Sequence, residues 1–365
     1  MTDFTPDDHI FMTQALRLAE QGLYTTMPNP RVGCVVVNNG KVVGVGVHLA
    51  AGTPHAEIHA LEQAGEHAKG ATAYVTLEPC SHHGRTPPCV EALIKANVVK
   101  VVIAMQDPNP LVSGQGVDAL QAAGITVLTG LMLEQAQLLN AGFIERMVNR
   151  MPLVRSKIAA TLDGKTALRN GVSQWITGAA ARSDVQHWRA RSCVIMTGIG
   201  TVLKDNPSLT VRELNINRQP ISVIVDSQLR MPLDAKLLKN KQVLIAFASD
   251  PENKAEQLTA MGVSLLCIPN EQGKVCLESL LSHLACNEVN EVMVEGGDGL
   301  NGALMALKLI DELVIYYAPK IMGSDAKGMF ALPTLHTMEE VASLEVREVR
   351  LFGNDIRILA RSIPT

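Results

Sequence analysis

Aromatic residues are scarce in this chain, where Phe, Trp and Tyr together make up 3% of the 365 residues. No apolar run approaches the roughly 18 residues that a membrane-spanning helix needs. Residues 1–8 lack the basic and apolar regions of a secretory signal, and the sequence has neither an internal repeat nor a low-complexity segment. These absences argue against membrane, secreted and repeat proteins. They predict that the chain has no membrane partner and works in the cytoplasm.

Charge and cysteine content narrow the class further. The net charge is −4 and the isoelectric point is near 6.2, which argues against a nucleic-acid partner because phosphate backbones attract clustered Lys and Arg. A small-molecule substrate is therefore expected. Seven cysteines are an odd number, which is typical of an intracellular protein with reduced thiols. A hydrophobic content of 47% indicates a soluble α/β protein, and the length predicts two domains.

The most informative group in the sequence is one histidine and two cysteines: His55, Cys80 and Cys89. An imidazole and two thiolates fill three corners of a zinc tetrahedron, and the fourth corner can hold a water whose pKa the metal lowers. Glu57 follows the histidine by two residues. In zinc-dependent base deaminases with this spacing, the glutamate carries a proton from the water to the departing amine. The pattern predicts one catalytic zinc per chain, with Glu57 as the proton carrier.

The helices and strands around this group favour a catalytic site. Thr53 and Pro54 are the expected N-cap and first-turn proline of a helix that holds His55 and Glu57 in its first turn. Cys80 comes just after a predicted strand at 73–77. Prolines at 87 and 88 open a second helix that carries the other cysteine, and helix N-termini favour anionic thiolates.

Two other interpretations remain open at this point. A structural zinc site would need four protein ligands, and His82 or His83 could supply the fourth. That site would suit a zinc-stabilised regulatory module that binds a nucleotide without turnover. The same zinc chemistry would also suit a nucleic-acid base deaminase with an appended binding module, although the acidic charge balance speaks against this class.

Alternating helix and strand patterns predict two α/β domains. In the first, a helix at 7–21 precedes a hairpin of 34–37 and 41–47 with a type I′ turn at Asn39-Gly40. The pattern continues with strands at 73–77, 98–105 and 125–128, a helix at 116–123, and a helical stretch at 131–147. Pro152 breaks it. A second alternation has strands at 153–160, 193–197, 221–226, 242–247, 291–295 and 312–318. We therefore place the domains at 1–147 and 152–365.

A glycine-rich segment, 295–302, follows the strand at 291–295 and leads into a predicted helix at 300–307. Such a loop lets backbone N–H groups approach a phosphate at a helix N-terminus, although a plain strand-to-helix turn fits equally well. A Rossmann fingerprint would need an acidic residue at the end of the next strand. The sequence has Ala318-Pro319-Lys320 there, so a dinucleotide site at this loop would not be of the Rossmann type.

A second polar segment, 197–212, combines glycine, proline and polar residues directly after a strand. Such a composition marks a functional loop more often than a simple connector. Arg212 at its end and Arg189 upstream would suit a phosphate group, because a guanidinium binds phosphate oxygens in a bidentate fork. An ordinary surface position is the alternative for either arginine alone.

Several longer motifs resemble those of the bifunctional riboflavin biosynthesis deaminase/reductase family. In the first half these are residues 28–33, 55–57 and 79–89, and in the second half they are residues 157–165, 175–178, 200–212 and 295–297. The resemblance covers almost the whole chain, with no departure at the metal ligands. It implies an N-terminal cytidine-deaminase-like α/β/α domain and a C-terminal dihydrofolate-reductase-like α/β domain.

The resemblance also implies two consecutive reactions on one phosphoribosylated pyrimidine. The first domain would hydrolyse the 2-amino group of 2,5-diamino-6-(5-phosphoribosylamino)pyrimidin-4(3H)-one to ammonia and 5-amino-6-(5-phosphoribosylamino)uracil. The second would use NADPH to reduce the opened ribose to a ribityl chain. We further expect a homo-oligomer, in a state that the sequence does not define.

By matching position, the resemblance assigns residues to both sites. The deaminase pocket would be lined by Asn29, His48, His82, Arg85, Asp107 and Asn109. The nucleotide would be held by Ala159, Trp175, Thr201, Asp205, Ser227, Gly297, Asp298, Gly299, Leu300, Asn301, Gly302 and Ala303. The sugar phosphate would be held or oriented by Lys157, Ser173, Arg189, Leu209, Arg212 and Glu295. Arginines in both domains suit a substrate with one phosphate, while the chain as a whole stays acidic.

Overall fold

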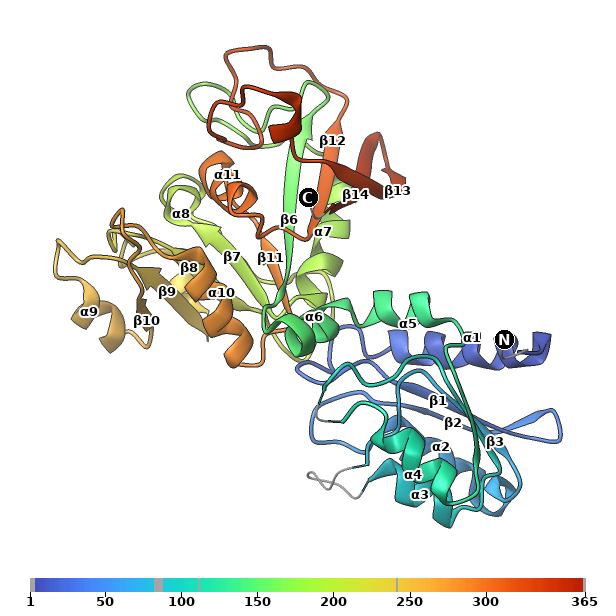
Figure 1. The fold of residues 1–365 in the computed structure, drawn as a ribbon. Helices are drawn as coiled ribbons and strands as arrows, with labels where there is room; N and C mark the ends of the chain where they lie inside the picture. Colours follow the sequence, from blue (N-terminus) through green and yellow to red (C-terminus); the bar gives the residue numbers. More distant parts are fainter. Residues whose placement is uncertain (1–3, 82–87, 111, 241, 364–365) are drawn as a thin grey trace. The chain divides into compact units, whose positions relative to one another are not determined.

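The computed structural model describes residues 4–81, 88–110, 112–240 and 242–363 (Figure 1). It divides the chain into two compact units, Met1–Arg150 and Met151–Thr365. Each unit has one sheet; the strand order is β2-β1-β3-β4-β5 in the first and β10-β9-β8-β7-β11-β6-β12-β14-β13 in the second. Within the described ranges, no helix combines the length and the apolar character needed to cross a membrane.

The first unit alternates strands and helices along the chain. Its strands are β1 Gly33–Asn38, β2 Lys41–Val47, β3 Thr72–Val75, β4 Lys100–Ile103 and β5 Thr126–Thr129. Its helices are α1 Pro6–Glu20, α2 Ala56–Ala64, α3 Cys89–Lys95, α4 Gln115–Ala122, α5 Leu133–Leu139 and α6 Ala141–Asn149, with a 3-10 helix at Gly65–Ala68. β1 is antiparallel to β2 and β3, and β3, β4 and β5 are parallel. Asn39 and Gly40 both have positive φ, as the predicted type I′ turn requires.

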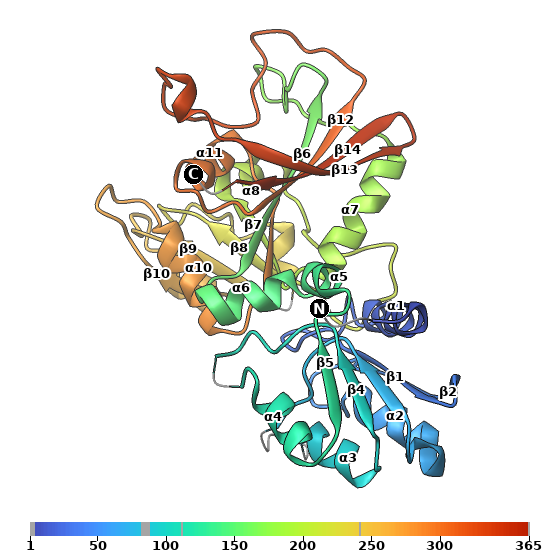
Figure 2. The ribbon, with the colours of Figure 1, turned by 45° about the vertical axis from the view of Figure 1, so that its right-hand side comes forward.

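Glycines on this sheet allow helices to pack closely on both of its faces. A Cβ added at Gly33 would lie 2.0 Å from the carbonyl oxygen of Ala15 in α1, and one added at Gly46 would lie 1.9 Å from that of Ala56 in α2. Gly46 pairs with Cys34, the residue after Gly33, so the two glycines point to opposite faces. Figure 2 shows α1 on one side of the sheet and α2, α3 and α4 on the other. This confirms the predicted α/β/α layers.

The helix that carries Glu57 begins later than predicted. α2 has His55 at its N-cap position, without a side-chain cap, and the assignment of Thr53 as the N-cap is wrong. Thr53 donates its hydroxyl instead to the carbonyl of Ala50 at 2.7 Å. The carbonyl of Pro54 accepts a hydrogen bond from His48 at 3.2 Å, so both residues are bonded within the loop that precedes the helix.

The helical stretch predicted at 131–147 is interrupted. Asn140 separates α5 from α6 and is buried. Its side chain accepts the backbone N–H of Arg31 at 2.8 Å and donates to the carbonyl of Arg31 at 3.0 Å. A partner 109 residues away leaves no local sequence pattern, which is why helical periodicity predicted a single helix.

The second unit is a larger α/β fold. Its strands are β6 Leu153–Thr161, β7 Val194–Gly198, β8 Ile221–Val225, β9 Val243–Phe247, β10 Ser264–Cys267, β11 Glu291–Val294, β12 Glu312–Ala318, β13 Leu344–Phe352 and β14 Asp355–Ser362. Its α-helices are α7 Ala179–Arg191, α8 Ile199–Asp205, α9 Ala255–Ala260, α10 Leu277–Cys286 and α11 Asp298–Ala306. Lys236–Lys239 and Met338–Glu340 form 3-10 helices. Neighbouring strands are parallel from β10 to β12, whereas β14 is antiparallel to both β12 and β13.

The strands predicted for this unit all form, but three others were missed. The predicted strands are buried parallel strands, which have near-continuous apolar sequences. β10 is short and half-buried, and β13 is exposed at most positions with charged residues between apolar ones. These strands carry weaker apolar signals, which explains why the sequence pattern did not reveal them.

Candidate active sites

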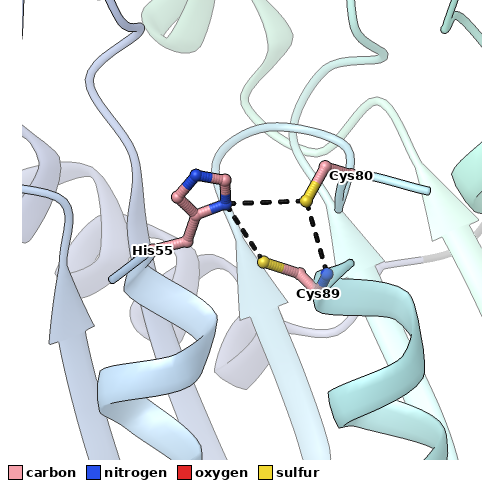
Figure 3. Close-up of side chains that lie close together, drawn as sticks. All are labelled: His55, Cys80 and Cys89. Carbon is pink, nitrogen blue, oxygen red and sulfur yellow. Dashed lines mark hydrogen bonds between the residues drawn. The ribbon is translucent and has the colours of Figure 1, made fainter. Parts of the chain in front are cut away.

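Three candidate metal-ligand atoms converge in the first unit (Figure 3). His55 is the N-cap of α2, Cys89 opens α3, and Cys80 lies in the loop after β3. His55 Nδ1 is 3.2 Å from Cys89 Sγ and 3.5 Å from Cys80 Sγ. The Cys89 backbone N–H donates to Cys80 Sγ at 3.3 Å. Within the part of the chain that the structure describes, no fourth His, Cys, Asp or Glu joins this group.

The geometry and chemistry of the group fit zinc. A tetrahedral zinc ion holds its ligand atoms roughly 3.5 to 4 Å apart, and the ligand atoms of this group all lie within 4.8 Å of one another. Hydrogen bonds from Cys89 and His55 stabilise the thiolate of Cys80 and lower the pKa of this thiol below its ordinary value. Thiolate and imidazole are the donors that zinc prefers. His82 and His83, the candidates for a fourth ligand, lie outside the described residues, as does the predicted pocket residue Arg85.

Glu57 lies beside the three ligands without joining them. It is in the first turn of α2, is 3% exposed, and lies close enough to Cys80 and His55 for their charges to act on its carboxyl group. Burial, together with the negative charge on Cys80, raises the pKa of Glu57 to about 7. A carboxyl group with a pKa near neutrality can both accept and release a proton, as a general acid–base catalyst must.

Two predicted pocket residues adjoin the metal ligands. The His48 ring meets that of His55 edge-to-face, with 5.3 Å between centroids. His48 Nδ1 donates to the carbonyl of Pro54 at 3.2 Å, and its Nε2 accepts from the Asn29 side-chain amide at 3.0 Å. Burial lowers the pKa of His48, which favours the neutral ring that this pattern requires. The arrangement leaves Asn29 fixed beside the candidate zinc site.

A carboxylate that the sequence analysis missed organises the neighbouring loop. Glu78 is buried two residues before Cys80, and it accepts hydrogen bonds from backbone N–H groups. The donors are Asp107 at 3.0 Å, Gly114 at 3.1 Å, Gly116 at 2.8 Å and Val117 at 3.2 Å. The side chain of Asp107 in turn accepts the backbone N–H of Asn109 at 2.9 Å. Glu78 thus ties the predicted pocket residues of this loop to the segment that carries Cys80.

The second unit contains a cleft of about 1270 Å³. The predicted cofactor and substrate residues of this unit line it, with the exception of Gly302. A Cβ added at Gly302 would lie 2.2 Å from the carbonyl oxygen of Ala331, so this glycine faces a neighbouring chain segment instead. In contrast, a Cβ added at Gly297 or Gly299 would meet no atom within 4 Å. These two glycines leave room for a ligand to approach the backbone at the start of α11.

Basic side chains outnumber acidic ones in the lining of this cleft. The basic residues are Lys157, Arg182, Arg189, Lys204, Arg212, Lys236, Lys274 and Lys327, against the acidic residues Asp205, Glu213, Glu295 and Asp298. The lining thus has eight basic residues and four acidic ones, in a chain whose net charge is −4. The imbalance suits an anionic ligand such as a phosphate ester.

Glu295 at the end of β11 orients two of these basic groups. Arg189 donates hydrogen bonds from Nε and Nη2 to the two carboxylate oxygens of Glu295, at 2.6 and 3.0 Å. Lys157 Nζ lies 3.3 Å from Oε2 of the same carboxylate. Burial acts to raise the pKa of Glu295, but the charges of Arg189 and Lys157 outweigh it and bring the pKa down to about 2. The carboxylate therefore stays charged and holds both cations in place at neutral pH.

Side chains also fix the backbone of the loop that presents Arg212. Arg189 Nη1 donates to the carbonyl of Thr210 at 2.9 Å. Gln219 accepts the N–H of Val211 at 2.8 Å and donates to its carbonyl at 3.2 Å. Gln186 in α7 accepts the N–H of Arg212 at 2.9 Å. Three successive residues of the loop are thus held from outside the loop, and the sequence analysis missed both glutamines.

Comparison with known proteins places both units in known families. The family model described as "Cytidine and deoxycytidylate deaminase zinc-binding region" matches residues 5–105, and the one described as "RibD C-terminal domain" matches residues 152–358. Riboflavin biosynthesis protein RibD of Escherichia coli is 47% identical over 361 residues, which cover 96% of this chain and 98% of the relative. Its counterpart in Haemophilus influenzae is 46% identical, with 98% of each chain covered. The chain belongs to the RibD family.

Solved RibD structures have the same fold over the full length. The structure described as Acinetobacter baumannii RibD, form 1, has a TM-score of 0.92 and 45% identity, covering 98% of this chain and 99% of the other. A diaminohydroxyphosphoribosylaminopyrimidine deaminase/5-amino-6-(5-phosphoribosylamino)uracil reductase from Thermotoga maritima has a TM-score of 0.87 and 33% identity, with the same coverage. Membership of the RibD family confirms the predicted fold class, a cytidine-deaminase-like domain followed by a dihydrofolate-reductase-like one.

Proposed function

We propose that this chain catalyses two consecutive steps of riboflavin biosynthesis, the process for which its RibD relatives are named. Residues 1–147 deaminate 2,5-diamino-6-(5-phosphoribosylamino)pyrimidin-4(3H)-one, and residues 152–365 reduce the ribose of the product with NADPH. The observation that carries this proposal is the His55, Cys80 and Cys89 group with Glu57 buried beside it, followed in the same chain by a basic cleft. A cytoplasmic location goes with this function, because none of the seven cysteines, all among the described residues, forms a disulfide.

In the deaminase unit, the side chains hold the metal and move the proton. His55, Cys80 and Cys89 bind zinc, which when present supplies a water acidic enough to act as a nucleophile near neutral pH. Glu57 accepts a proton as oxygen attacks C2 of the pyrimidine, and it then protonates the exocyclic nitrogen. The C2–N bond breaks, ammonia leaves, and the ring becomes the uracil.

Asn29 provides the fixed polar contact for the ring. Its amide is held by His48, which cannot turn away because Pro54 holds the other ring nitrogen. A base that hydrogen-bonds with Asn29 is therefore oriented relative to His55 before the reaction begins.

In the reductase unit, the protein mainly binds and orients. NADPH, when bound, supplies the two electrons of the reduction, so the side chains need little acid or base strength. Gly297 and Gly299 leave the backbone open to a phosphate of the dinucleotide. Arg189, Lys157 and Arg212 attract the phosphate of the substrate, and Glu295 keeps the first two directed into the cleft.

The proposal is tested by supplying the purified protein with the diaminopyrimidine phosphate, with and without NADPH. Ammonia release should occur in both reactions, and NADPH absorbance should fall only after deamination. Ammonia release should stop on removal of zinc by a chelator, while NADPH oxidation with the deaminated substrate continues. Absence of either signal from zinc-loaded protein would refute the corresponding half of the proposal.

A further inference from the structure

Trp175 is an aromatic side chain that remains exposed in the cleft of the second unit. It lies in the loop between β6 and α7, lines the cleft, and is 66% exposed. Ile176, the next residue in the loop, is buried. The loop is therefore anchored through one apolar side chain while the indole ring stays open to solvent. A ring of this kind offers a flat surface on which a planar group of a ligand can stack.

Arg182, near the start of α7, covers one face of this ring. Its guanidinium carbon lies over the indole, 4.6 Å from the ring centroid, which is within the range of a cation–π contact. The guanidinium is itself held, because Nη1 donates a hydrogen bond to the carbonyl of Thr177 at 2.6 Å. Arg182 thus limits the rotation of the Trp175 side chain and leaves the opposite face of the indole for a ligand.

The backbone of the loop is also fixed by contacts that do not involve Arg182. Lys320 donates a hydrogen bond from Nζ to the carbonyl of Trp175 at 2.9 Å. The backbone N–H of Gly178 donates to Oδ2 of Asp355 at 2.6 Å. Loss of the Arg182 side chain would leave both contacts in place, so its main effect would be to free the indole ring within an otherwise fixed loop.

Trp175 lies at the end of the cleft where the proposed reduction takes place. Lys320, which holds its carbonyl, follows β12 by two residues, and β12, β6 and β11 are neighbours in the sheet (Figure 1). Lys157 in β6 and Glu295 after β11 belong to the proposed site for the sugar phosphate. The nicotinamide ring must reach the sugar here. Ser227, which follows β8, lies three strands from β6, about 14 Å away, so the adenosine half extends to the other end.

We propose that Arg182 is a positioning residue of the reductase, which holds the Trp175 indole so that its free face stacks on the nicotinamide ring of NADPH. This inference rests on the proposed NADPH-dependent reduction and deepens it. A side chain that is already fixed in its binding orientation loses little conformational freedom when the ligand binds. The fixed indole also orients the nicotinamide ring relative to the sugar near Lys157.

The first test measures the mobility of Trp175 without any ligand. The chain has two tryptophans, and Trp188 lies outside the cleft lining, so Trp188→Phe leaves Trp175 as the only fluorescent indole. In that background, Arg182→Met should speed the decay of the fluorescence anisotropy, because the guanidinium no longer covers the ring. Arg169→Met, at an exposed position of the same loop, is the matched control and should leave the decay unchanged.

The second test compares NADPH with 2′,5′-ADP, which has the adenosine half of the dinucleotide and lacks nicotinamide. Isothermal titration calorimetry without substrate gives the dissociation constant of each ligand. Arg182→Met should raise the dissociation constant of NADPH about 5- to 30-fold, the range expected for a lost cation–π contact in a partly desolvated site. The dissociation constant of 2′,5′-ADP should stay unchanged, because the adenosine half lies at the other end of the cleft.

The proposal requires both results, so an unchanged anisotropy decay or an unchanged NADPH affinity in Arg182→Met would overturn it. Equal weakening of both ligands would overturn it too, because Arg182 would then support the fold of the whole cleft. A loss confined to the KM for the deaminated substrate would show that Arg182 binds the sugar phosphate instead. Failure of the proposed function looks different: wild-type protein would neither bind NADPH nor oxidise it with the deaminated substrate.

Discussion

Glu57 is the residue that distinguishes a deaminase from a structural zinc site. Glu57→Gln keeps the size of the side chain but removes its ability to accept a proton. We expect ammonia release to fall by about 10² to 10⁴, while zinc content by metal analysis stays at one per chain. Loss of zinc in this variant, or unchanged ammonia release, would contradict the role given to Glu57. NADPH oxidation with the deaminated substrate is the control, because it occurs in the other unit.

Gln186 is the residue through which α7 acts on the substrate loop. Gln186→Ala leaves the N–H of Arg212 without its acceptor at 2.9 Å, and a lost hydrogen bond of this kind costs about 1 to 2 kcal/mol. We expect the KM for the phosphorylated substrate to rise about tenfold, with the KM for NADPH unchanged. Steady-state kinetics of NADPH oxidation measure both constants. Equal changes in the two would show that the side chain supports the fold of the cleft and not the phosphate site.

The sequence revealed only some of these residues, for a physical reason. Zinc ligands must be particular residue types at restricted spacings, so His55, Cys80 and Cys89 stand out. Glu78, Gln186 and Gln219 bind backbone N–H or carbonyl groups of segments that are distant or irregular, and any residue can supply those groups. Their role therefore leaves no trace in the residue types around them.

Close packing of α2 on β2 determines where the metal ligand His55 lies. Gly46→Ala would place a Cβ 1.9 Å from the carbonyl oxygen of Ala56, which is backbone and cannot turn aside. We expect α2 to shift, the thermal transition of the first unit to fall by several degrees, and the affinity for zinc to weaken. Calorimetry and a zinc-chelator competition measure the two effects. Val42→Ala, at an exposed position of the same strand, is the control, and equal effects of both changes would count against this explanation.

Elements with a strong local pattern were predictable, and those set by distant partners were not. The buried strands β6, β7 and β8 appear in the sequence as apolar runs, and the turn at Asn39 appears as a favourable dipeptide. The break at Asn140 depends on Arg31, and β13 depends on a bulge and on pairing with β14. Periodicity describes one element at a time, so it cannot report contacts of this kind.

Each unit of the molecule has its own core, its own site and its own acid-sensitive carboxylate. In the first unit, Asp8 completes the capping box of α1 by accepting hydrogen bonds from the N-cap residue Thr5, and it also accepts one from Tyr74 at 2.7 Å. Burial acts to raise the pKa of Asp8, but these hydrogen bonds and Lys100 lower it to about 2. In the second unit, the charges of Arg189 and Lys157 lower the pKa of the buried Glu295 to about 2. Acid should therefore weaken both units.

The direction of this pH dependence follows from proton binding. Both carboxylates bind protons more weakly in the folded chain than in the unfolded chain, where their pKa values return to the ordinary 3.8 and 4.5. The stability that they contribute is complete above about pH 4.5 and is lost as the pH falls toward 2. Calorimetry between pH 2 and pH 7 should show that the transition temperatures of both units decrease as the pH falls below about 4.5.

The variant Asp8→Asn tests whether Asp8 causes the acid-induced loss of stability in the first unit. The change keeps the size of the side chain but removes the negative charge that strengthens its hydrogen bonds. The free energy of unfolding of the first unit should therefore fall by about 1 to 2 kcal/mol at neutral pH. Its transition should then depend less on pH below 4.5, because the titrating group is gone. The second unit should keep the full pH dependence through Glu295. Asp118→Asn, at an exposed position of the first unit, is the control and should leave both slopes as they are. A first-unit transition in Asp8→Asn that falls in parallel with wild type would show that other groups cause the acid sensitivity.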